Sequence, residues 1–164
     1  MQLAGPLEIQ GLGGNDLLRV FIGSATLAGG DGDGDDQYYL YDPGTVITEL
    51  AGESTDLTRA AVDLVLAASF ENGAALGASD VDLTGNALGN QLTGNAVVNA
   101  LSGLAGNDRL RGRAGEDTLD GGLGNDILEG GADADRFVLR TGNGSDLIQD
   151  FETDTDVIDF TNAV

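Results

Sequence analysis

Large apolar residues recur at a spacing of nine through the second half of the chain. From residue 85 the sequence divides into six units of nine: GNALGNQLT, GNAVVNALS, GLAGNDRLR, GRAGEDTLD, GGLGNDILE and GGADADRFV. The eighth position is always apolar, as Leu92, Leu101, Leu110, Leu119, Leu128 and Phe137, and Leu83 extends this ladder backward. One short unit cannot bury its apolar residue alone, so the pattern predicts a stack of repeated units.

The polar positions keep the same period. The first position of each unit is Gly85, Gly94, Gly103, Gly112, Gly121 or Gly130, and the sixth is Asn90, Asn99, Asp108, Asp117, Asp126 or Asp135. Glycine permits a tight turn, and the three residues around the apolar position predict a short strand with one inward side chain. Such a turn directs backbone carbonyls inward, and an Asp carboxylate completes an all-oxygen set suited to a hard cation such as calcium.

The unit matches the pattern G-G-x-G-x-D-x-U-x, where U is a large apolar residue. GGLGNDILE at 121–129 matches in full, the units at 103–111 and 112–120 lack the second glycine, and Asp133 replaces the fourth glycine of the last unit. The pattern resembles the calcium-binding nonapeptide of RTX (repeats-in-toxin) modules in exported bacterial proteins. The resemblance implies an all-β fold, a parallel β-roll or β-solenoid with two nonapeptides per coil and several calcium ions between loops on the same edge.

The resemblance also implies which residues hold calcium. Loops on one edge are separated by two nonapeptides, which pairs 103–108 with 121–126 and 112–117 with 130–135. In the family, one loop gives the carbonyls of its first and third positions, and its partner gives those of its second and fourth. With the sixth-position side chains, the implied ligands are Gly103, Ala105, Asp108, Gly122, Gly124, Asp126, Gly112, Ala114, Asp117, Gly131, Asp133 and Asp135. Asn90 and Asn99 are candidates at the same position, although an amide is a weaker calcium ligand than a carboxylate.

Looser repeats occur at the N-terminal end. GLGGNDLLR at 11–19 places Asp16 at the metal position, and DGDGDDQYY at 31–39 places Asp36 there, so we expect the two on one edge. Residues 31–42 also have acids at the first, third, fifth and twelfth places of an EF-hand loop. Asp36 stands at the sixth place, where that loop needs glycine, and this disfavours the EF-hand interpretation.

The segment 42–82 fits two patterns equally well. TDLTRAAVDLVLAASF has apolar residues at helical spacing and also alternates as strands would. Segments similar to its YYLYDPGTVITE stretch lie between RTX repeats in many exported bacterial proteins, and this resemblance favours strands that continue the roll.

At the C-terminal end, TGNGSDLIQ at 141–149 places Asp146 to pair with the Asp126 loop. DFETDTDVIDF at 150–160 resembles the ending of RTX modules in secreted metalloproteases and alginate epimerases, and we expect its apolar residues to cover the open end of the roll. We therefore predict one continuous solenoid domain in four segments. These are degenerate repeats at 1–41, intervening strands at 42–82, the regular roll at 83–140 and a cap at 141–164.

The composition narrows the function. The 164 residues include 28 acids, seven Arg and no Lys, His or Cys, for a net charge of -21. Triads with His, thiol nucleophiles and the usual zinc sites are excluded, and a chain this acidic is not expected to bind nucleic acid. No apolar run approaches the ~20 residues of a membrane span, so we expect no membrane insertion, and the first residues show no signal-peptide pattern. An acidic surface also suits a chain adapted to high salt. That adaptation would not explain the period of nine, so it could only accompany another function.

Two functions remain. The first is a module that folds on extracellular calcium, is exported by a type I system, as the resemblance implies, and stabilises a larger bacterial protein. The second is an adhesin or extracellular polysaccharide-binding segment in which calcium is only structural. For that function Arg109, Arg111 and Arg113 are the candidate contacts, although the simpler interpretation is that they offset nearby acids. We expect no catalysis by this chain, while the parent protein could itself be an enzyme.

Overall fold

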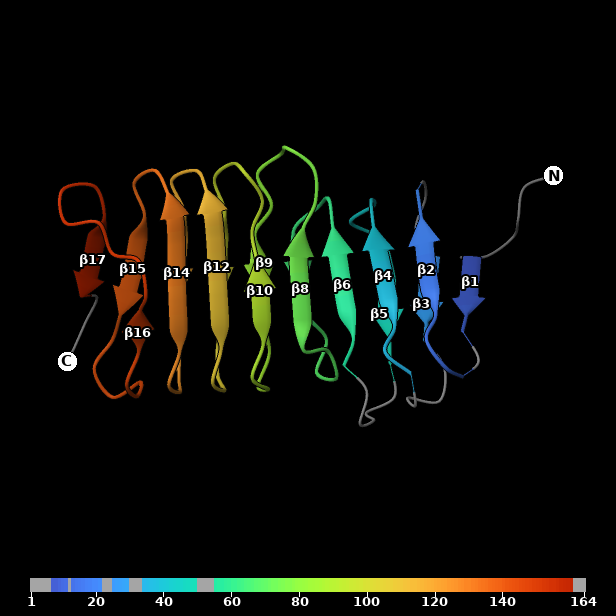
Figure 1. Cartoon of the computed structure of the whole chain (residues 1–164). Helices are drawn as coiled ribbons and strands as arrows, with labels where there is room; N and C mark the ends of the chain where they lie inside the picture. The colour runs from blue at the N-terminus through green and yellow to red at the C-terminus, as the bar shows by residue number, and fades with distance from the viewer. Residues whose placement is uncertain (1–6, 12, 22–24, 30–33, 50–54, 161–164) are drawn as a thin grey trace.

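The chain folds into short parallel strands. The computed structural model describes residues 7–11, 13–21, 25–29, 34–49 and 55–160, and these contain seventeen β-strands and no helix. The strands stack along one axis, with the N-terminal coils at one end and the C-terminal coils at the other (Figure 1). Within the described ranges, nothing forms a helix that could cross a membrane. The prediction of an all-β parallel solenoid is confirmed.

The larger sheet faces the viewer in Figure 1 and has eight strands in the order β16-β14-β12-β10-β8-β6-β4-β2. Its strands are β2 (Leu17–Val20), β4 (Gln37–Leu40), β6 (Leu57–Ala60), β8 (Asn72–Ala75), β10 (Gln91–Thr93), β12 (Arg109–Ala114), β14 (Ile127–Ala132) and β16 (Leu147–Ile148). All neighbouring pairs in it are parallel, as stacked coils require.

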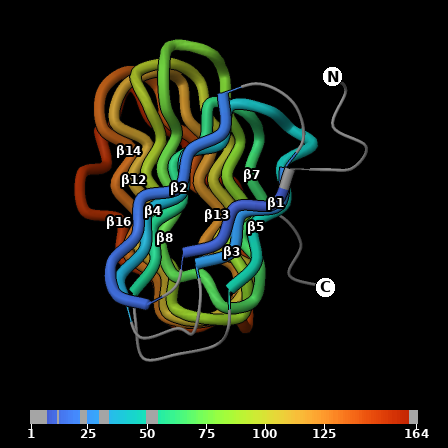
Figure 2. Tube along the Cα trace, turned by 90° about the vertical axis from the view of Figure 1, so that its right-hand side faces the viewer, coloured from blue at the N-terminus to red at the C-terminus, as the bar shows by residue number. Residues whose placement is uncertain are grey.

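Two smaller parallel sheets cover the opposite side (Figure 2). The six-stranded sheet contains β7 (Leu64–Val65), β9 (Leu83–Thr84), β11 (Ala100–Ser102), β13 (Thr118–Asp120), β15 (Arg136–Leu139) and β17 (Val157–Phe160). The three-stranded sheet contains β1 (Leu7–Gln10), β3 (Ala25–Ala28) and β5 (Val46–Thr48). Since β5 and β7 are not paired, this side of the roll is interrupted between them.

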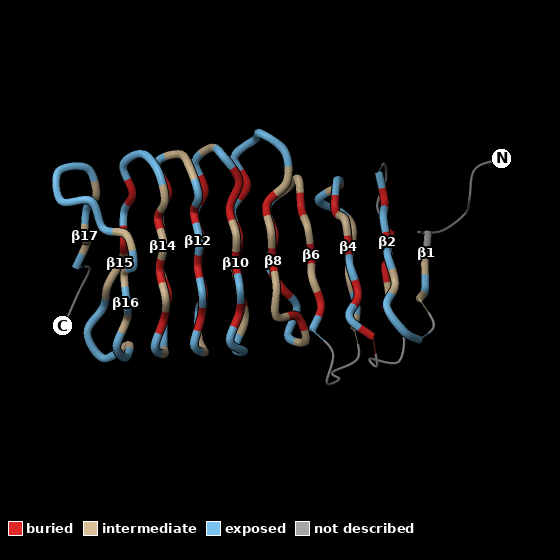
Figure 3. The backbone as a smooth tube through the Cα atoms, viewed as in Figure 1, coloured by how far each residue is buried: buried red, intermediate tan, exposed pale blue. Residues whose placement is uncertain are grey.

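The apolar ladder sets the register of the regular coils. Leu92 pairs with Leu110, and Leu110 with Leu128, across the eight-stranded sheet. On the other side Leu101 pairs with Leu119, and Leu119 with Phe137. Each step spans two nonapeptides, so two units make one coil, as predicted. The ladder residues are almost completely buried and form a narrow core along the axis, and in the regular coils inward buried positions alternate with more exposed ones along the strands (Figure 3).

The segment 42–82 continues the roll, and the helical alternative is wrong. It forms β5, β6, β7 and β8 in coils of unequal length. The coil from β4 to β6 pairs Tyr38 with Thr58, whereas the shorter coil from β6 to β8 pairs Thr58 with Gly73. Gly73 has no side chain at this inward position, and Leu64, Leu66 and Leu92 surround the space. Of the alternative EF-hand loop at 31–42, residues 31–33 lie outside the described residues. The rest contains strand β4, which pairs with β2 and β6 in the sheet, so that alternative is wrong too.

The final strand, β17, pairs with β15 at the edge of the six-stranded sheet. Ile158 pairs with Phe137, and the Phe151 ring lies 6.1 Å from the ring of that same Phe137. Val157 and Phe160 face outward, with 56% and 76% of their surface exposed. Only part of the apolar content of 150–160 therefore covers the end of the core.

Candidate metal centres

Two columns of acidic and amide side chains follow the two edges of the roll. Each member ends a turn and directly precedes a strand, which points its side chain to the inside of the turn. One column contains Asp16, Asp36, Asp56, Glu71, Asn90, Asp108, Asp126 and Asp146, and the other contains Asn99, Asp117, Asp135 and Asp156. Seven of the predicted sixth-position residues are at most 3% exposed: Asp36, Asn90, Asn99, Asp108, Asp117, Asp126 and Asp135. Carboxylates this deeply buried require compensation.

One oxygen of each carboxylate is used to hold consecutive coils together. Asp108 Oδ1 accepts the backbone N–H of Asn90 at 2.7 Å, and Asp126 Oδ1 accepts that of Asp108 at 2.8 Å. On the other edge Asp117 Oδ1 accepts the N–H of Asn99 at 2.7 Å, and Asp135 Oδ1 accepts that of Asp117 at 2.9 Å. Each of these Asp side chains thus binds the backbone of the column residue one coil earlier.

The second oxygen of the same carboxylates has no partner. Oδ2 is buried without a hydrogen bond in Asp16, Asp108, Asp117, Asp126 and Asp135. An unpaired buried carboxylate oxygen is costly, and here the same orphan recurs in coil after coil.

Glycine keeps the space beside these oxygens open. A side chain on Gly103 would collide with Asp108 Oδ2 and with the carbonyl oxygen of Gly121 in the next coil. The same convergence occurs on the other edge, at Gly112 beside Asp117 Oδ2. A carboxylate oxygen and a carbonyl oxygen that face one space are hard donors, and they fit calcium rather than a softer metal.

The loops predicted to share calcium lie side by side. Gly106 N–H donates to the Leu123 carbonyl at 2.9 Å, and Leu123 N–H donates to that of Leu104 at 2.8 Å, which joins the loops 103–108 and 121–126. Ala105 forms an isolated bridge with Leu123 between them. Gly122 and Gly124 lie in this second loop with positive φ angles of 93° and 138°. Which of their carbonyls bind metal stays a prediction.

The second pair of loops is joined in a similar way. Across 112–117 and 130–135, Ala114 pairs with Ala132, and Gly131 stands opposite Arg113. Asp133 is exposed, and its Oδ2 accepts the N–H of Gly115 in the partner loop at 3.1 Å. Its φ of 79° preserves the left-handed conformation of the glycine that it replaces.

Asn90 and Asn99 behave differently from the Asp residues in the same columns. Asn90 Nδ2 donates to the Phe70 carbonyl at 3.0 Å, and Asn99 Nδ2 donates to that of Val81 at 2.7 Å. Their Oδ1 atoms accept the N–H groups of Asn86 and Asn95 at 2.8 Å. The Nδ2 groups of the two amides therefore give these carbonyl oxygens the positive partner that a cation would otherwise supply. At these two coils the geometry favours an amide in place of a cation.

Burial governs the acidity of the Asp columns. It raises the pKa of Asp108 and Asp135 to about 6 and that of Asp117 to about 7. The backbone N–H bond to Oδ1 opposes this shift, and the charge of the next carboxylate in the column adds to it. The pKa of Asp126 is raised for the same reasons. The metal-free edges therefore hold carboxylates that ionise less readily than carboxylates in water.

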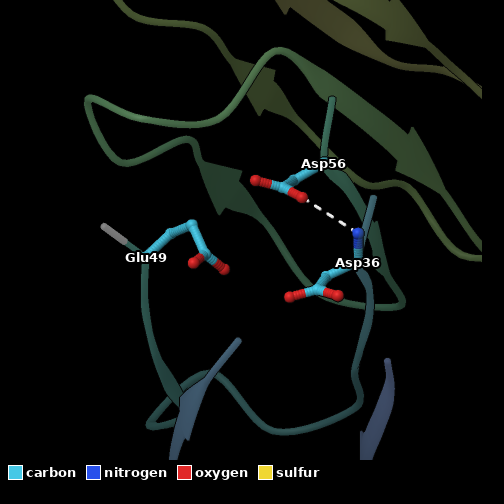
Figure 4. A group of neighbouring side chains, drawn as sticks. All are labelled: Asp36, Glu49 and Asp56. Atoms are coloured by element: carbon cyan, nitrogen blue, oxygen red, sulfur yellow. Dashed lines mark hydrogen bonds between the residues drawn. The ribbon is translucent and has the colours of Figure 1, made fainter. Parts of the chain in front are cut away.

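A third group lies in the N-terminal coils. Asp36 and Asp56 end the turns before β4 and β6, Glu49 follows β5, and their carboxylates gather around one space (Figure 4). One oxygen from each lies within 4.8 Å of the others. Asp36 N–H donates to Asp56 Oδ1 at 2.9 Å, and the buried Tyr38 hydroxyl donates to Glu49. Burial raises the pKa of Asp56 to about 6. Asp16 joins this column through its N–H, which donates to Asp36 Oδ1 at 2.8 Å.

Sequence reasoning missed Asp56 and Glu49 as members of these edges. Asp56 precedes Leu57-Thr58 as Asp36 precedes Gln37-Tyr38, so a search that allowed coils longer than two nonapeptides could have found it. Glu49 stands at the first position of its turn, where the period predicts glycine. Asp156 accepts the N–H of Asp135 at 3.0 Å, as the D-x-I spacing to Ile158 indicates. Asp146 accepts the N–H of Asp126 at 3.1 Å, which places it beside the predicted loop.

Comparison with known families agrees with this geometry. A family model for the RTX calcium-binding nonapeptide repeat, which describes four copies, matches residues 93–128 and again residues 102–137. Among curated proteins, none gives a significant sequence match. The matched residues include the four Asp108, Asp117, Asp126 and Asp135 carboxylates and the regular coils that carry them. Residues 93–137 therefore carry RTX calcium-binding repeats, and together with the parallel solenoid they support an RTX β-roll module.

Proposed function

We propose that this module folds when it binds calcium, with ions held between successive turns on both edges. The observation that carries the proposal is the contrast within one column. The Asp residues each leave a buried Oδ2 without a partner, whereas the Asn residues at equivalent positions use both polar atoms of their side chains in hydrogen bonds. A divalent cation at the open spaces would compensate the orphan oxygens and the facing carbonyls together.

The energetics couple binding to folding. The core is one apolar residue wide in each regular strand, and the chain carries 28 acids against seven bases. Without a counter-ion, the buried carboxylates must be protonated or must remain charged at a cost, and the acidic surface repels itself. Because the ligand oxygens come from separate coils, they converge only in the folded chain. The free energy of calcium binding therefore becomes free energy of folding.

The proposed ligands are those that the repeat pattern predicts. The regular coils would use the 103–108, 112–117, 121–126 and 130–135 loops. In the N-terminal coils we include Asp16, whose buried Oδ2 has no partner, as a calcium ligand. We include Asp36 as well, because it follows Asp16 in the same column. At Asn90 and Asn99 no ion is needed.

The same proposal gives the module a place outside the cell. RTX repeats are typical of secreted bacterial proteins, and extracellular calcium sites of such modules work at Kd values of ~10⁻⁴–10⁻³ M. In a compartment poor in calcium the chain would remain unfolded, and it would fold after export. We propose a structural role as the appendage of a larger protein exported by a type I system, with any catalysis in another part of that protein.

Calcium titration of EDTA-stripped protein tests the proposal. Far-UV circular dichroism should show a cooperative gain of β signal at roughly 0.1–1 mM calcium and none with equal magnesium. Asp108→Ala and Asp126→Ala should each raise the midpoint, whereas the exposed Asp80→Ala should not. A stripped protein that is already fully β and indifferent to calcium would overturn the proposal.

A further inference from the structure

The arginines are concentrated on one face of an otherwise acidic molecule. Among the residues of the eight-stranded sheet there are five arginines, Arg19, Arg59, Arg109, Arg111 and Arg113, and a single acid, Glu129. All six charged side chains project from the outer surface of that sheet. Five positive charges and one negative charge give the strands of this sheet a formal charge of +4 in a chain whose total is -21, while Asp35 and Asp36 lie beside them in the turn before β4.

The arginines differ in whether a carboxylate already neutralises them. Arg109 and Arg111 both reach Glu129, at 3.6 and 2.8 Å. Arg136 and Arg140, on the opposite side of the roll, are paired with Asp159 and Asp120. Within the described part of the chain, Arg19, Arg59 and Arg113 form no ion pair with a carboxylate. Three guanidinium groups without an acid are unexpected in a chain with 28 acids.

Two of these arginines are held in place by a ring rather than by a charge. The Arg19 guanidinium carbon lies 4.3 Å from the centre of the Tyr39 ring, and that of Arg59 lies 5.4 Å from it. Arg59 also donates to Gln37 Oε1 at 2.7 Å. These contacts fix the Arg59 side chain above the sheet while leaving most of its donors available.

A hollow of about 450 Å³ lies on the same face over β4, β6, β8 and β10. Arg59 and Arg113 line it together with the amides of Gln37, Asn72 and Gln91. Beyond Asn72 its floor is low, because β8 continues there with the small residues Gly73 and Ala74. Asp35 and the buried Asp36 lie at one end, in the turn before β4. Asp35 Oδ1 accepts the N–H of Thr55, and Asp36 Oδ1 accepts that of Asp16, so an anionic ligand would contact the middle of the hollow.

We propose that this hollow binds a carboxylate-bearing oligosaccharide, with Arg59 and Arg113 on uronate carboxylates and the three amides on sugar hydroxyls. A planar guanidinium matches a carboxylate with two parallel hydrogen bonds, and side-chain amides both donate to and accept from hydroxyl groups. The strands below are paired on both sides, so a peptide would gain no backbone pairing here, which favours a glycan over an acidic peptide. This site goes beyond the calcium function and differs from the Arg109, Arg111 and Arg113 set expected from the sequence.

Isothermal titration calorimetry on the full chain in saturating calcium tests the site, with tetragalacturonate as the probe. The heat of mixing the probe with calcium buffer is subtracted, and circular dichroism verifies that each variant has the wild-type calcium-loaded fold. Arg59→Gln and Arg113→Gln should each weaken binding roughly tenfold or more, because each removes a charge-assisted contact. Arg136→Gln, on the other side of the roll, is the matched control and should bind as wild type.

Three outcomes would overturn the proposal. These are the absence of binding by a correctly folded wild-type protein, equal loss in the Arg136→Gln control, and equal affinity for the fully methyl-esterified tetramer. A tetraglutamate peptide that binds as tightly as tetragalacturonate would assign the hollow to acidic peptides instead. Because folding is followed separately, a failure of the calcium proposal would be visible as a change in the dichroism signal rather than in the heats.

Discussion

Replacing Asp117 by asparagine should stabilise the metal-free roll, although it removes a predicted calcium ligand. Burial raises the pKa of this carboxyl from 3.8 to about 7, so at pH 7.5 its ionised form costs the folded state about 4 kcal/mol relative to the unfolded chain. An amide carries no charge, and it keeps one oxygen for the Asn99 N–H that Asp117 now accepts at 2.7 Å. Asn99 itself shows that this position tolerates the amide.

The assay is the concentration of sucrose that half-folds each protein in EDTA, followed by far-UV circular dichroism, because excluded osmolytes favour the compact state. Asp117→Asn should need less sucrose than wild type and should respond less to calcium. Asp117→Ala is the matched comparison, since it removes the charge and also leaves the Asn99 N–H without an acceptor, and it should gain less. Asp80→Asn, at an exposed site, controls for net charge. If Asp117→Asn needs as much sucrose as wild type or more, the buried charge is not what opposes folding.

Three further changes follow from the same geometry. Burial raises the folded-state pKa of Asp108 and Asp135 from 3.8 to about 6. The metal-free roll should therefore be most stable below pH 3.8 and should lose stability as the pH rises from 3.8 through 6. Calcium affinity should change in the opposite sense and decrease as the pH is lowered from 7.5 to 5.5, because protonated carboxylates bind calcium less well. Circular dichroism in EDTA at each pH measures the stability, and calcium titrations at each pH measure the affinity. Gly103→Ala should remove an ion, counted by equilibrium dialysis, because the added methyl would fill the space beside Asp108 Oδ2. Leu104→Gly should raise stability in saturating calcium by about 1 kcal/mol in urea denaturation, because Leu104 has a φ of 74°; an unchanged midpoint would contradict this.

The regular half of the fold was predictable because a strict period fixes the register. Once Leu92, Leu110 and Leu128 are each separated by two nonapeptides, stacking them places every turn of the coil above its neighbour. The N-terminal half has no such constraint. Its coil from Tyr38 to Thr58 is longer than its coil from Thr58 to Gly73, and the core adjusts to each length with a different side chain. Propensity alone could not distinguish strand from helix there, because packing decided it.

The candidate sites were predictable as positions but not as chemistry. The sixth residue of each unit follows from the period, so Asp108 and Asn90 receive the same prediction from the sequence. Only the structure distinguishes them, because the difference lies in whether the second polar atom of each side chain has a partner. The hollow with Arg59 and Arg113 was equally hidden. These two residues are distant in the sequence, and their proximity depends on the irregular coil lengths between them.

The mixture of Asn and Asp in one column limits what calcium has to do. The coils of Asn90 and Asn99 lie between the N-terminal group around Asp36 and the regular Asp loops, and they close their edges with hydrogen bonds from within the chain. A column made only of Asp would place a buried charge in every coil, and each would need an ion before the next could form. With one neutral turn on each edge, these coils need no ion of their own, and once they stack they present a formed edge to the Asp loops on either side. Calcium binding at those loops can then propagate the register that the central leucines set.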